Sequence, residues 1–205
     1  MTTSLARFKD GYTNGGRSVA LRFMQSFRSL PLTPNQLSIA GFTLNVAAGV
    51  LIFEQHWVWA TVVFVVGSVA DALDGALARA HNKMTPFGAF LDSTLDRVSE
   101  GVILGAIALV LADQGKTVAL ACVFVALVGS FLVSYTRAKA EAFGLKGDVG
   151  LMSRVERIVL LALALPFAGR GSLPYAIYLL AALTTVTVVQ RIIFVRTQLN
   201  SKVEG

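Results

Sequence analysis

The sequence predicts an all-α, polytopic membrane protein with six transmembrane helices and an N-terminal amphipathic helix on the membrane surface. Of its 205 residues, 55% are hydrophobic and 15% are charged, and the mean hydropathy is +0.66. Soluble domains are rarely so apolar. Apolar runs of about 20 residues, enough to cross a bilayer as a helix, alternate with short polar turns. Composition and spacing together favour a membrane-embedded helical bundle.

The N-terminal segment, residues 1–30, is basic and mixed in polarity. Arg17, Arg22 and Arg28 alternate with apolar side chains, a pattern typical of a helix that lies in the membrane interface. We therefore expect a juxtamembrane amphipathic helix here. A disordered basic tail is the alternative interpretation.

Six apolar segments follow and are expected to form one bundle over residues 31–196, within a single membrane domain of residues 1–205. Thr33 is placed to cap the first helix, because threonine favours the capping position and Pro34 suits the first helical position. The spans are expected near residues 37–53, 57–80, 86–111, 117–139, 154–167 and 175–195.

Lysine and arginine are concentrated on one side of the expected bundle. They crowd residues 1–30, 79–83 and 137–157 and the C-terminal tail, whereas the intervening loops carry only Lys116 and Arg170. The positive-inside rule places the crowded side in the cytoplasm, at the cell membrane. The net charge of +6 favours contact with anionic membrane lipids. No nucleic-acid-binding motif is found, so we expect no nucleic-acid partner.

Four aspartates stand out within residues 69–100: Asp71, Asp74, Asp92 and Asp96. The first two are three residues apart and the last two are four apart, so on helices each pair shares one face. A polar break separates the pairs and lets the two helices turn back on each other. Ionisable groups in a membrane protein are costly and usually functional, so these aspartates are candidate site residues.

The physical problem raised by these aspartates is mutual repulsion, which a divalent cation would relieve. Carboxylate oxygens suit Mg2+, Mn2+ or Ca2+. Gly75, Ala78 and Gly88 continue the two acidic faces with almost no side chain, which leaves room for a bulky, phosphate-bearing group. A solvated acidic hairpin is one alternative. A cation transporter is a more remote one, because transport sites belong near the bilayer midplane and these residues lie at helix ends.

Together these positions form the pattern Asp71-x2-Asp74-Gly75-x2-Ala78-Arg79-x8-Gly88-x3-Asp92-x3-Asp96. The pattern resembles the full signature of the CDP-alcohol phosphotransferases. The resemblance implies that Mg2+, with Mn2+ possible, is bound by the four aspartates, and that Asp96 is the general base. It also implies a homodimer. The residues it implies for the CDP-lipid are Thr33, Pro34, Asp71, Asp74, Gly75, Ala78 and Arg79.

A second cluster of charges surrounds the loop after the fourth span. Arg137 and Lys139 end that span, and Arg154 and Arg157 begin the fifth. Arginine suits phosphate because its planar guanidinium bonds oxygens in pairs. Beside four carboxylates, these cations indicate a phosphorylated substrate. The alternative is that they only set the membrane topology.

The same region contains Ser134-Tyr135, Ala140-Glu141-Ala142, Gly144-Leu145-x-Gly147-Asp148 and Arg154-x-Glu156-Arg157. These runs are similar to those of the bacterial phosphatidylinositol-phosphate synthase branch of the family. The resemblance implies transfer of a phosphatidyl group from CDP-diacylglycerol to inositol 1-phosphate, with release of CMP. It implies an acceptor-phosphate site made of Arg137, Arg154 and Arg191.

Arg191 also stands out by itself, because it lies in an otherwise apolar span. Its charge requires either snorkelling to the membrane surface or a bound anion. Two alternatives keep the same chemistry with other substrates: glycerol 3-phosphate as the acceptor, or an ether lipid as the donor.

Overall fold

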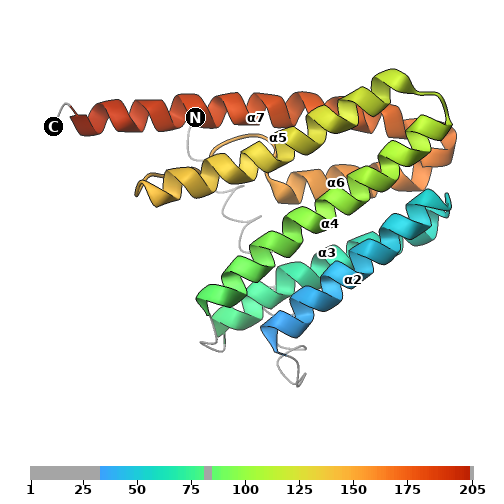
Figure 1. The fold of residues 1–205 in the computed structure, drawn as a ribbon, viewed down its shortest axis with the longest axis horizontal. Helices are drawn as coiled ribbons and strands as arrows, with labels where there is room; N and C mark the ends of the chain where they lie inside the picture. The colour runs from blue at the N-terminus through green and yellow to red at the C-terminus, as the bar shows by residue number, and fades with distance from the viewer. Residues whose placement is uncertain (1–32, 81–84, 204–205) are drawn as a thin grey trace, which may run out of the picture.

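The computed structural model describes residues 33–80 and 85–203, with all side chains except those of residues 34, 74–80, 202 and 203. The described part contains helices and no strand (Figure 1). The helices are α2 (Pro34–Phe53), α3 (Trp57–Ala80), α4 (Pro86–Asp113), α5 (Thr117–Ala142), α6 (Arg154–Ala164), the 3-10 helix η1 (Leu165–Arg170) and α7 (Ser172–Val203). The predicted surface helix of residues 1–30 lies outside the described residues.

Most predicted helix starts are confirmed. The helices α3, α4, α5 and α6 begin at the expected residues 57, 86, 117 and 154. The predicted cap of α2 is also present: Thr33 Oγ1 accepts from the Gln36 N–H at 3.3 Å, and the Thr33 N–H donates to Gln36 Oε1 at 2.9 Å. This reciprocal pair is a capping box.

The expected end of the fifth span is wrong. The α-helix α6 stops at Ala164, and η1 continues the chain to Arg170. Pro166 accounts for the change, because it has no amide hydrogen and its ring clashes with the preceding turn of an α-helix. Gly171, with φ of 85°, ends η1, and glycine adopts this conformation without strain. The chain therefore enters α7 at Ser172, earlier than expected.

Three described helical stretches are long and apolar enough to cross a membrane: Asn35–Phe53, Thr117–Ala142 and Ser172–Ser201. A fourth apolar stretch, Trp57–Leu73, is shorter. Between Asp92 and Glu100 the helix α4 carries four charged residues, and α6 has only 11 residues. The apolar helices fit a membrane protein, and the number of six spans stays a prediction.

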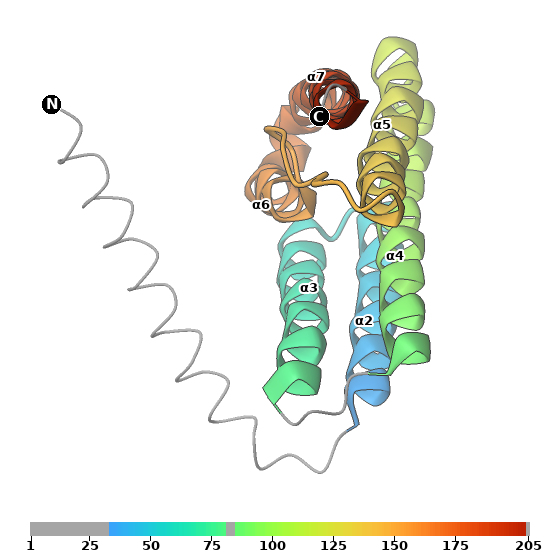
Figure 2. The same ribbon diagram turned by 90° about the vertical axis from the view of Figure 1, so that its left-hand side faces the viewer.

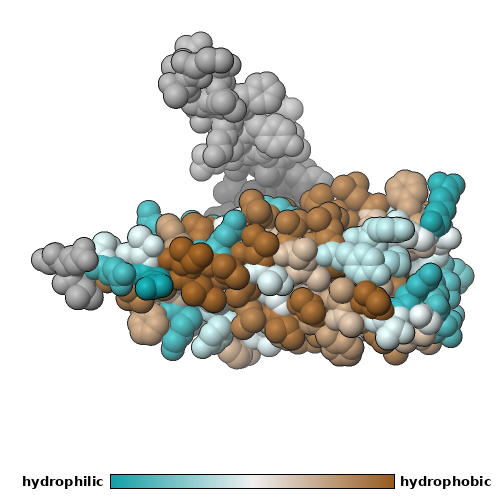
Figure 3. Space-filling model, turned by 90° about the horizontal axis from the view of Figure 1, so that it is seen from above, coloured by the Kyte–Doolittle hydropathy of each residue, from teal (hydrophilic) through white to brown (hydrophobic). Residues whose placement is uncertain are grey.

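The surface agrees with this assignment. Large apolar side chains are exposed along the outer faces of α5 and α7, among them Phe124, Val128, Leu179 and Val186. In Figure 3 apolar residues cover the middle of the molecule, and hydrophilic residues gather at its two ends. A lipid environment accommodates such a band without the free-energy cost that water would impose.

The helices run up and down, so that two ends of the molecule can be distinguished. The helix α2 packs against α3 and α4, α5 packs against α7, and α6 packs against α7 and α3. The starts of α2, α4 and α6 and the ends of α3, α5 and α7 lie toward the left of Figure 1, the end seen in Figure 2. We call this the charged end.

The buried apolar core lies toward the opposite end. Ile52 near the end of α2, Phe64 in the first half of α3, Leu111 near the end of α4 and Leu165 in η1 belong to one buried cluster. These residues are close to the turns that join successive helices. Apolar packing therefore fixes one end of the bundle, and the other end is left for polar side chains.

Candidate active site

Three of the four predicted aspartates come together at the charged end. Asp71 on α3 and Asp92 and Asp96 on α4 each offer one carboxylate oxygen, and these oxygens lie within 4.8 Å of one another. Asp71 is only 3% exposed, whereas Asp92 and Asp96 are half-buried. Asp74 follows Asp71 by one turn of α3, and its side chain lies outside the described residues. We call the three described residues the aspartate cluster.

A close approach of α2 to α3 fixes the position of Asp71. A Cβ atom on Gly41 would lie 3.0 Å from Gly67 O and 3.1 Å from both the Cβ and the N atom of Asp71. A Cβ atom on Gly67 would lie 3.0 Å from Leu44 Cβ. Only glycine lets the two backbones come this close, and their contact buries Asp71.

The start of α4 is fixed against the start of α2. Thr85 Oγ1 accepts a hydrogen bond from the Gly88 N–H at 3.0 Å and caps the helix. A Cβ atom on Gly88 would lie 3.1 Å from Asn35 Oδ1, so the two helix starts are adjacent. Thr33 and Pro34, predicted to contact the nucleotide, therefore lie at the same end as the aspartate cluster.

The other predicted nucleotide residues, Gly75, Ala78 and Arg79, lie in the last turns of α3. Their side chains are outside the described part of the chain, so their contacts with a nucleotide stay predictions. The backbone shows that they continue the helix that carries Asp71.

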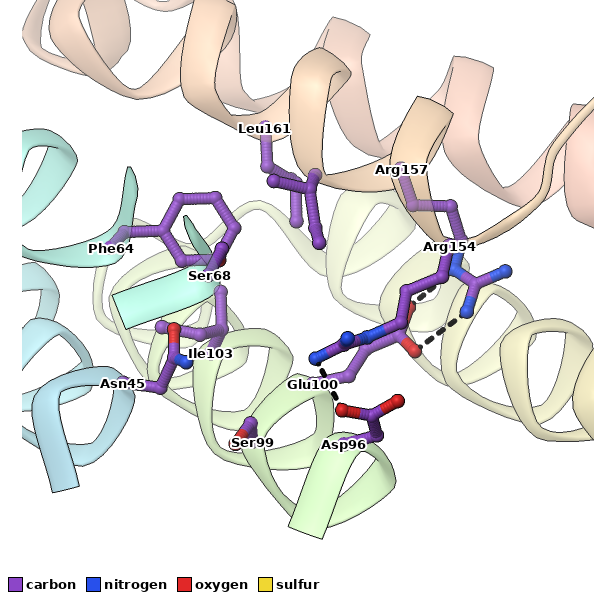
Figure 4. Close-up of a pocket in the computed structure, with 11 residues that line it drawn as sticks. Asn45, Phe64, Ser68, Asp96, Ser99, Glu100, Ile103, Arg154, Arg157 and Leu161 are labelled. Atoms are coloured by element: carbon purple, nitrogen blue, oxygen red, sulfur yellow. Dashed lines mark hydrogen bonds and ion pairs between the residues drawn. The ribbon is translucent and has the colours of Figure 1, made fainter. Parts of the chain in front are cut away.

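Arg154, predicted to bind the acceptor's phosphate, forms ion pairs with two members of the aspartate cluster, and Figure 4 shows the one with Asp96. Its Nη1 lies 2.5 Å from Asp71 Oδ2, and its Nη2 lies 2.8 Å from Asp96 Oδ1. The guanidinium compensates carboxylate charge that burial would otherwise make unfavourable. A phosphate that binds Arg154 would compete with these carboxylates for it.

One turn further along both helices, Arg157 is bonded to Glu100 (Figure 4). Sequence reasoning missed Glu100. The signal was available, because Asp92, Asp96 and Glu100 follow one another at intervals of four and so share one face of α4. The acidic face of α4 therefore extends one turn beyond Asp96, where the family signature ends.

Arg191 is compensated in a way that neither sequence-based alternative included. It is 4% exposed, its Nε donates to Val149 O at 2.8 Å, and its Nη1 donates to Val133 O. Backbone carbonyls therefore satisfy part of its charge, and a bound anion stays a prediction. Arg137 lies within electrostatic range of Arg191 and forms an exposed ion pair with Glu141 at 2.8 Å. The shared phosphate ligand of Arg137, Arg154 and Arg191 stays a prediction.

Two further polar residues were not predicted. Asn45 on α2 and Ser99 on α4 are buried, and Asn45 Oδ1 and Ser99 Oγ have no hydrogen-bond partner among the described residues. Both line a small cavity together with Asp96 and Arg154 (Figure 4). A single asparagine or serine in an apolar helix gives no sequence signal, so only the helix packing reveals them.

The donor set of the aspartate cluster fits a divalent metal. Three carboxylate oxygens within 4.8 Å of one another are hard ligands of the kind that Mg2+ and Mn2+ prefer. Mg2+ commonly completes its coordination with substrate phosphates and water. The site therefore contains two groups that assist phosphoryl transfer. The aspartates are ligands for a metal, and Arg154 is a cation for phosphate.

Known proteins resemble this chain in both sequence and fold. Residues 31–190 match the family model of the CDP-alcohol phosphatidyltransferases. The chain is 40% identical over 173 residues to archaetidylinositol phosphate synthase of Pyrococcus horikoshii, covering 83% of this chain and 87% of that protein. It is also 40% identical over 172 residues to phosphatidylinositol phosphate synthase of Corynebacterium glutamicum, covering 80% of this chain and 78% of that protein.

Two crystal structures of phosphatidylinositol phosphate synthase from Mycobacterium tuberculosis have the same fold. The form with CDP-DAG bound has a TM-score of 0.77 and 29% identity, over 87% of this chain and 94% of that chain. The form in complex with manganese and citrate has a TM-score of 0.76 and 30% identity, over 87% and 89%. The resemblance read from the aspartate pattern is thereby confirmed. This chain is a transferase that belongs to the CDP-alcohol phosphatidyltransferase family.

Proposed function

We propose that this transferase moves a phosphatidyl group from CDP-diacylglycerol to inositol 1-phosphate and releases CMP. The observation that carries the proposal is the bonding of Arg154 to Asp71 and Asp96. It brings a phosphate-binding cation to the carboxylates that would hold a metal on the donor's diphosphate. The two reacting substrates would thus meet at one place.

The named relatives support the acceptor more strongly than the donor. The archaeal and the corynebacterial proteins are equally identical to this chain, at 40%. Their names share inositol phosphate and differ in the lipid part, archaetidyl in one and phosphatidyl in the other. An ether-lipid donor is therefore the alternative that a specific observation favours, and the assay must include it.

Each acidic residue has a role in this proposal. Asp71, Asp74 and Asp92 would hold Mg2+ or Mn2+, with Asp96 as a further ligand. When bound, the metal neutralises the diphosphate and stabilises the leaving CMP. Asp96 would accept the proton of the acceptor hydroxyl as general base. The residues proposed to accommodate the nucleotide are Thr33, Pro34, Gly75, Ala78 and Arg79.

Arg154 links acceptor binding to the base. Its Nη2 forms an ion pair with Asp96 Oδ1 at 2.8 Å, and its partners for the acceptor's phosphate would be Arg137 and Arg191. A phosphate draws the guanidinium away from Asp96, because charge-assisted bonds to phosphate are strong and bidentate. The freed carboxylate oxygen of Asp96 then faces the acceptor hydroxyl. Free inositol lacks the phosphate and would not produce this exchange.

We further propose a homodimer in the cytoplasmic membrane, with all six helices spanning the bilayer and the charged end facing the cytoplasm. The basic residues near helix ends support this orientation. Soluble inositol phosphate would reach the aspartate cluster from the cytoplasm. The lipid chains of the donor would stay in the bilayer beside the exposed apolar faces of the helices.

The experiment that tests the proposal is a transfer assay with the purified protein in lipid nanodiscs. Radiolabelled CDP-diacylglycerol and CDP-archaeol are each offered inositol 1-phosphate, glycerol 3-phosphate and free inositol, with Mg2+ or Mn2+. We expect a metal-dependent lipid product and CMP with inositol 1-phosphate. A higher kcat/KM with glycerol 3-phosphate, or an equal rate with free inositol, would overturn the assigned acceptor.

A further inference from the structure

The ion pair between Glu100 and Arg157 joins α4 to α6 in the interior of the protein. Arg157 is 2% exposed, and its Nε and Nη2 are bonded to the two oxygens of Glu100 at 2.5 and 2.8 Å. Its remaining nitrogen, Nη1, donates to Met152 O at 3.3 Å. Every nitrogen of this guanidinium is therefore bonded within the protein, and binding of a substrate phosphate would have to break these bonds.

This inner pair repeats the geometry of the outer pair at the site. Asp96 and Glu100 are four residues apart on α4, and Arg154 and Arg157 are three apart on α6, so each helix presents one charged face to the other. The outer pair, Arg154 with Asp96, is partly exposed, with side chains 29% and 20% accessible. The inner pair is shielded, at 2% and 12%. The two ion pairs connect the same two helices, one helical turn apart.

At the level of Asp96 and Glu100, charged side chains rather than apolar ones connect α4 and α6. Buried apolar residues of both helices pack further inward, where Ile103 and Leu161 belong to the core. The helix α6 packs closely against α7, η1 and α3, whereas its backbone approaches α4 at very few points. A small cavity lies on the inner side of the ion pairs, among α2, α3, α4 and α6, and Phe64, Ile103 and Leu161 are among the residues that line it (Figure 4). Close-packed side chains normally fix such distances. At the charged end, Arg154 and Arg157 span the distance from α6 to α4.

Met152 connects this pair to the loop that precedes α6. Its carbonyl accepts from Arg157, and its N–H donates to Thr187 Oγ1 on α7 at 3.0 Å. The residue is buried and lies two positions before Arg154. Arg157 therefore holds both the backbone that leads into α6 and the facing helix α4.

We propose that Glu100 and Arg157 are positioning residues, which set the distance and register of α6 against α4 so that Arg154 reaches Asp71 and Asp96 together. The inference rests on the proposed function in one respect, the use of Arg154 and Asp96 in the reaction. It assigns Arg157 to positioning and not to phosphate binding, although the same short motif contains both arginines.

A positional role also explains why this site has an ion pair. Replacing a buried ion pair by apolar residues of similar volume is often neutral or stabilising for the fold, whereas removing one partner is strongly destabilising. Stability by itself therefore does not require charges at these two positions. Two bonds in the plane of the guanidinium fix an orientation, which apolar side chains cannot do.

The test separates stability from position with the double variant Glu100→Met/Arg157→Met in nanodiscs. We expect a thermal midpoint near that of the wild type, and a loss of about 10- to 100-fold in kcat/KM for the acceptor, as for a misplaced catalytic group. Glu54→Met/Arg170→Met is the matched control. It makes the same chemical changes at exposed residues of the opposite end, and it should behave as the wild type.

A double-mutant cycle shows whether the pair acts through Arg154. Arg154→Ala is measured alone and in the Glu100→Met/Arg157→Met background, using whichever acceptor gives the wild type its highest rate of CMP release. We expect the combined variant to be no worse than Arg154→Ala alone, because groups that act as a unit are not additive. The inference would be overturned if the losses in kcat/KM multiply in the combined variant, or if Glu100→Met/Arg157→Met by itself has wild-type kinetics.

A second variant keeps the test decisive if Glu100→Met/Arg157→Met fails to fold. Glu100→Asp keeps both charges and withdraws the carboxylate by one methylene, and it should be folded with the same selective loss of acceptor kcat/KM. If it also fails to fold, the pair is a stability element and the positioning role is wrong. Failure of the proposed function is seen separately, as a wild-type preference for another acceptor.

Discussion

Substitution of Gly41 by alanine tests how the close contact of α2 and α3 supports the aspartate cluster. The new Cβ atom would lie 3.0 Å from Gly67 O and 3.1 Å from the N and Cβ atoms of Asp71. Two of these three atoms belong to the α3 backbone and cannot turn away as a flexible side chain could. The helices must therefore separate by a few tenths of an ångström, and Asp71 moves with α3.

The expected change in the unfolding free energy of Gly41→Ala follows from a comparison with Gly105→Ala. Overpacking of this kind costs about 1–3 kcal/mol of unfolding free energy. Alanine in place of a helical glycine returns about 0.5–1 kcal/mol. A Cβ atom on Gly105 of α4 would meet no neighbouring atom of the described residues within 4 Å, so its variant shows the helical gain alone. The difference between the two variants is the overpacking cost, about 1–3 kcal/mol.

The assay combines thermal unfolding in one detergent with CMP release as a function of Mg2+ concentration. We expect Gly41→Ala to unfold at a lower temperature than Gly105→Ala. Its turnover should fall about severalfold to tenfold, because a cluster carboxylate is displaced by a fraction of an ångström. Gly105→Ala should keep wild-type turnover. If Gly41→Ala is as stable and as active as Gly105→Ala, the contact does not position Asp71.

Three further predictions address single charged groups. Asp92→Asn should remove transfer and leave the protein folded, because metal-assisted chemistry loses a ligand; near wild-type CMP release at saturating Mg2+ would contradict the metal assignment. Asp96→Asn should lower turnover about a hundredfold or more while CDP-lipid binding survives; an equal loss of donor binding, measured with a radiolabelled CDP-lipid, would make Asp96 chiefly a metal ligand. Arg191→Ala should raise the KM for inositol 1-phosphate by about one to two orders of magnitude, through a lost contact of about 1.5–3 kcal/mol. It should also lower the thermal midpoint, because the guanidinium bonds to Val133 O and Val149 O are lost. An unchanged acceptor KM with a lower midpoint would assign Arg191 to the loop alone.

Local chemistry made several features of this protein predictable from its sequence. Thr33 and Pro34 start α2 with a capping box, and the helices that begin at Trp57, Pro86 and Thr117 follow polar turns that the sequence displays. Helical periodicity put Asp92 and Asp96 on one face, and the structure brings both to Asp71. These features depend on residues within a few positions of one another, which is why the sequence determines them.

Contacts between distant segments required the tertiary structure. Arg154 is 83 residues from Asp71, and no periodicity of either helix specifies that their side chains meet. The same holds for Glu100 with Arg157, and for Arg191, whose charge is satisfied by carbonyls of α5 and the following loop. Charge patterns identified Asp71 and the three arginines as unusual, although Glu100 was missed. Their partners depend on how the helices cross, and that is set by packing over the whole bundle, from the glycine contact of α2 with α3 to the apolar core at the opposite end.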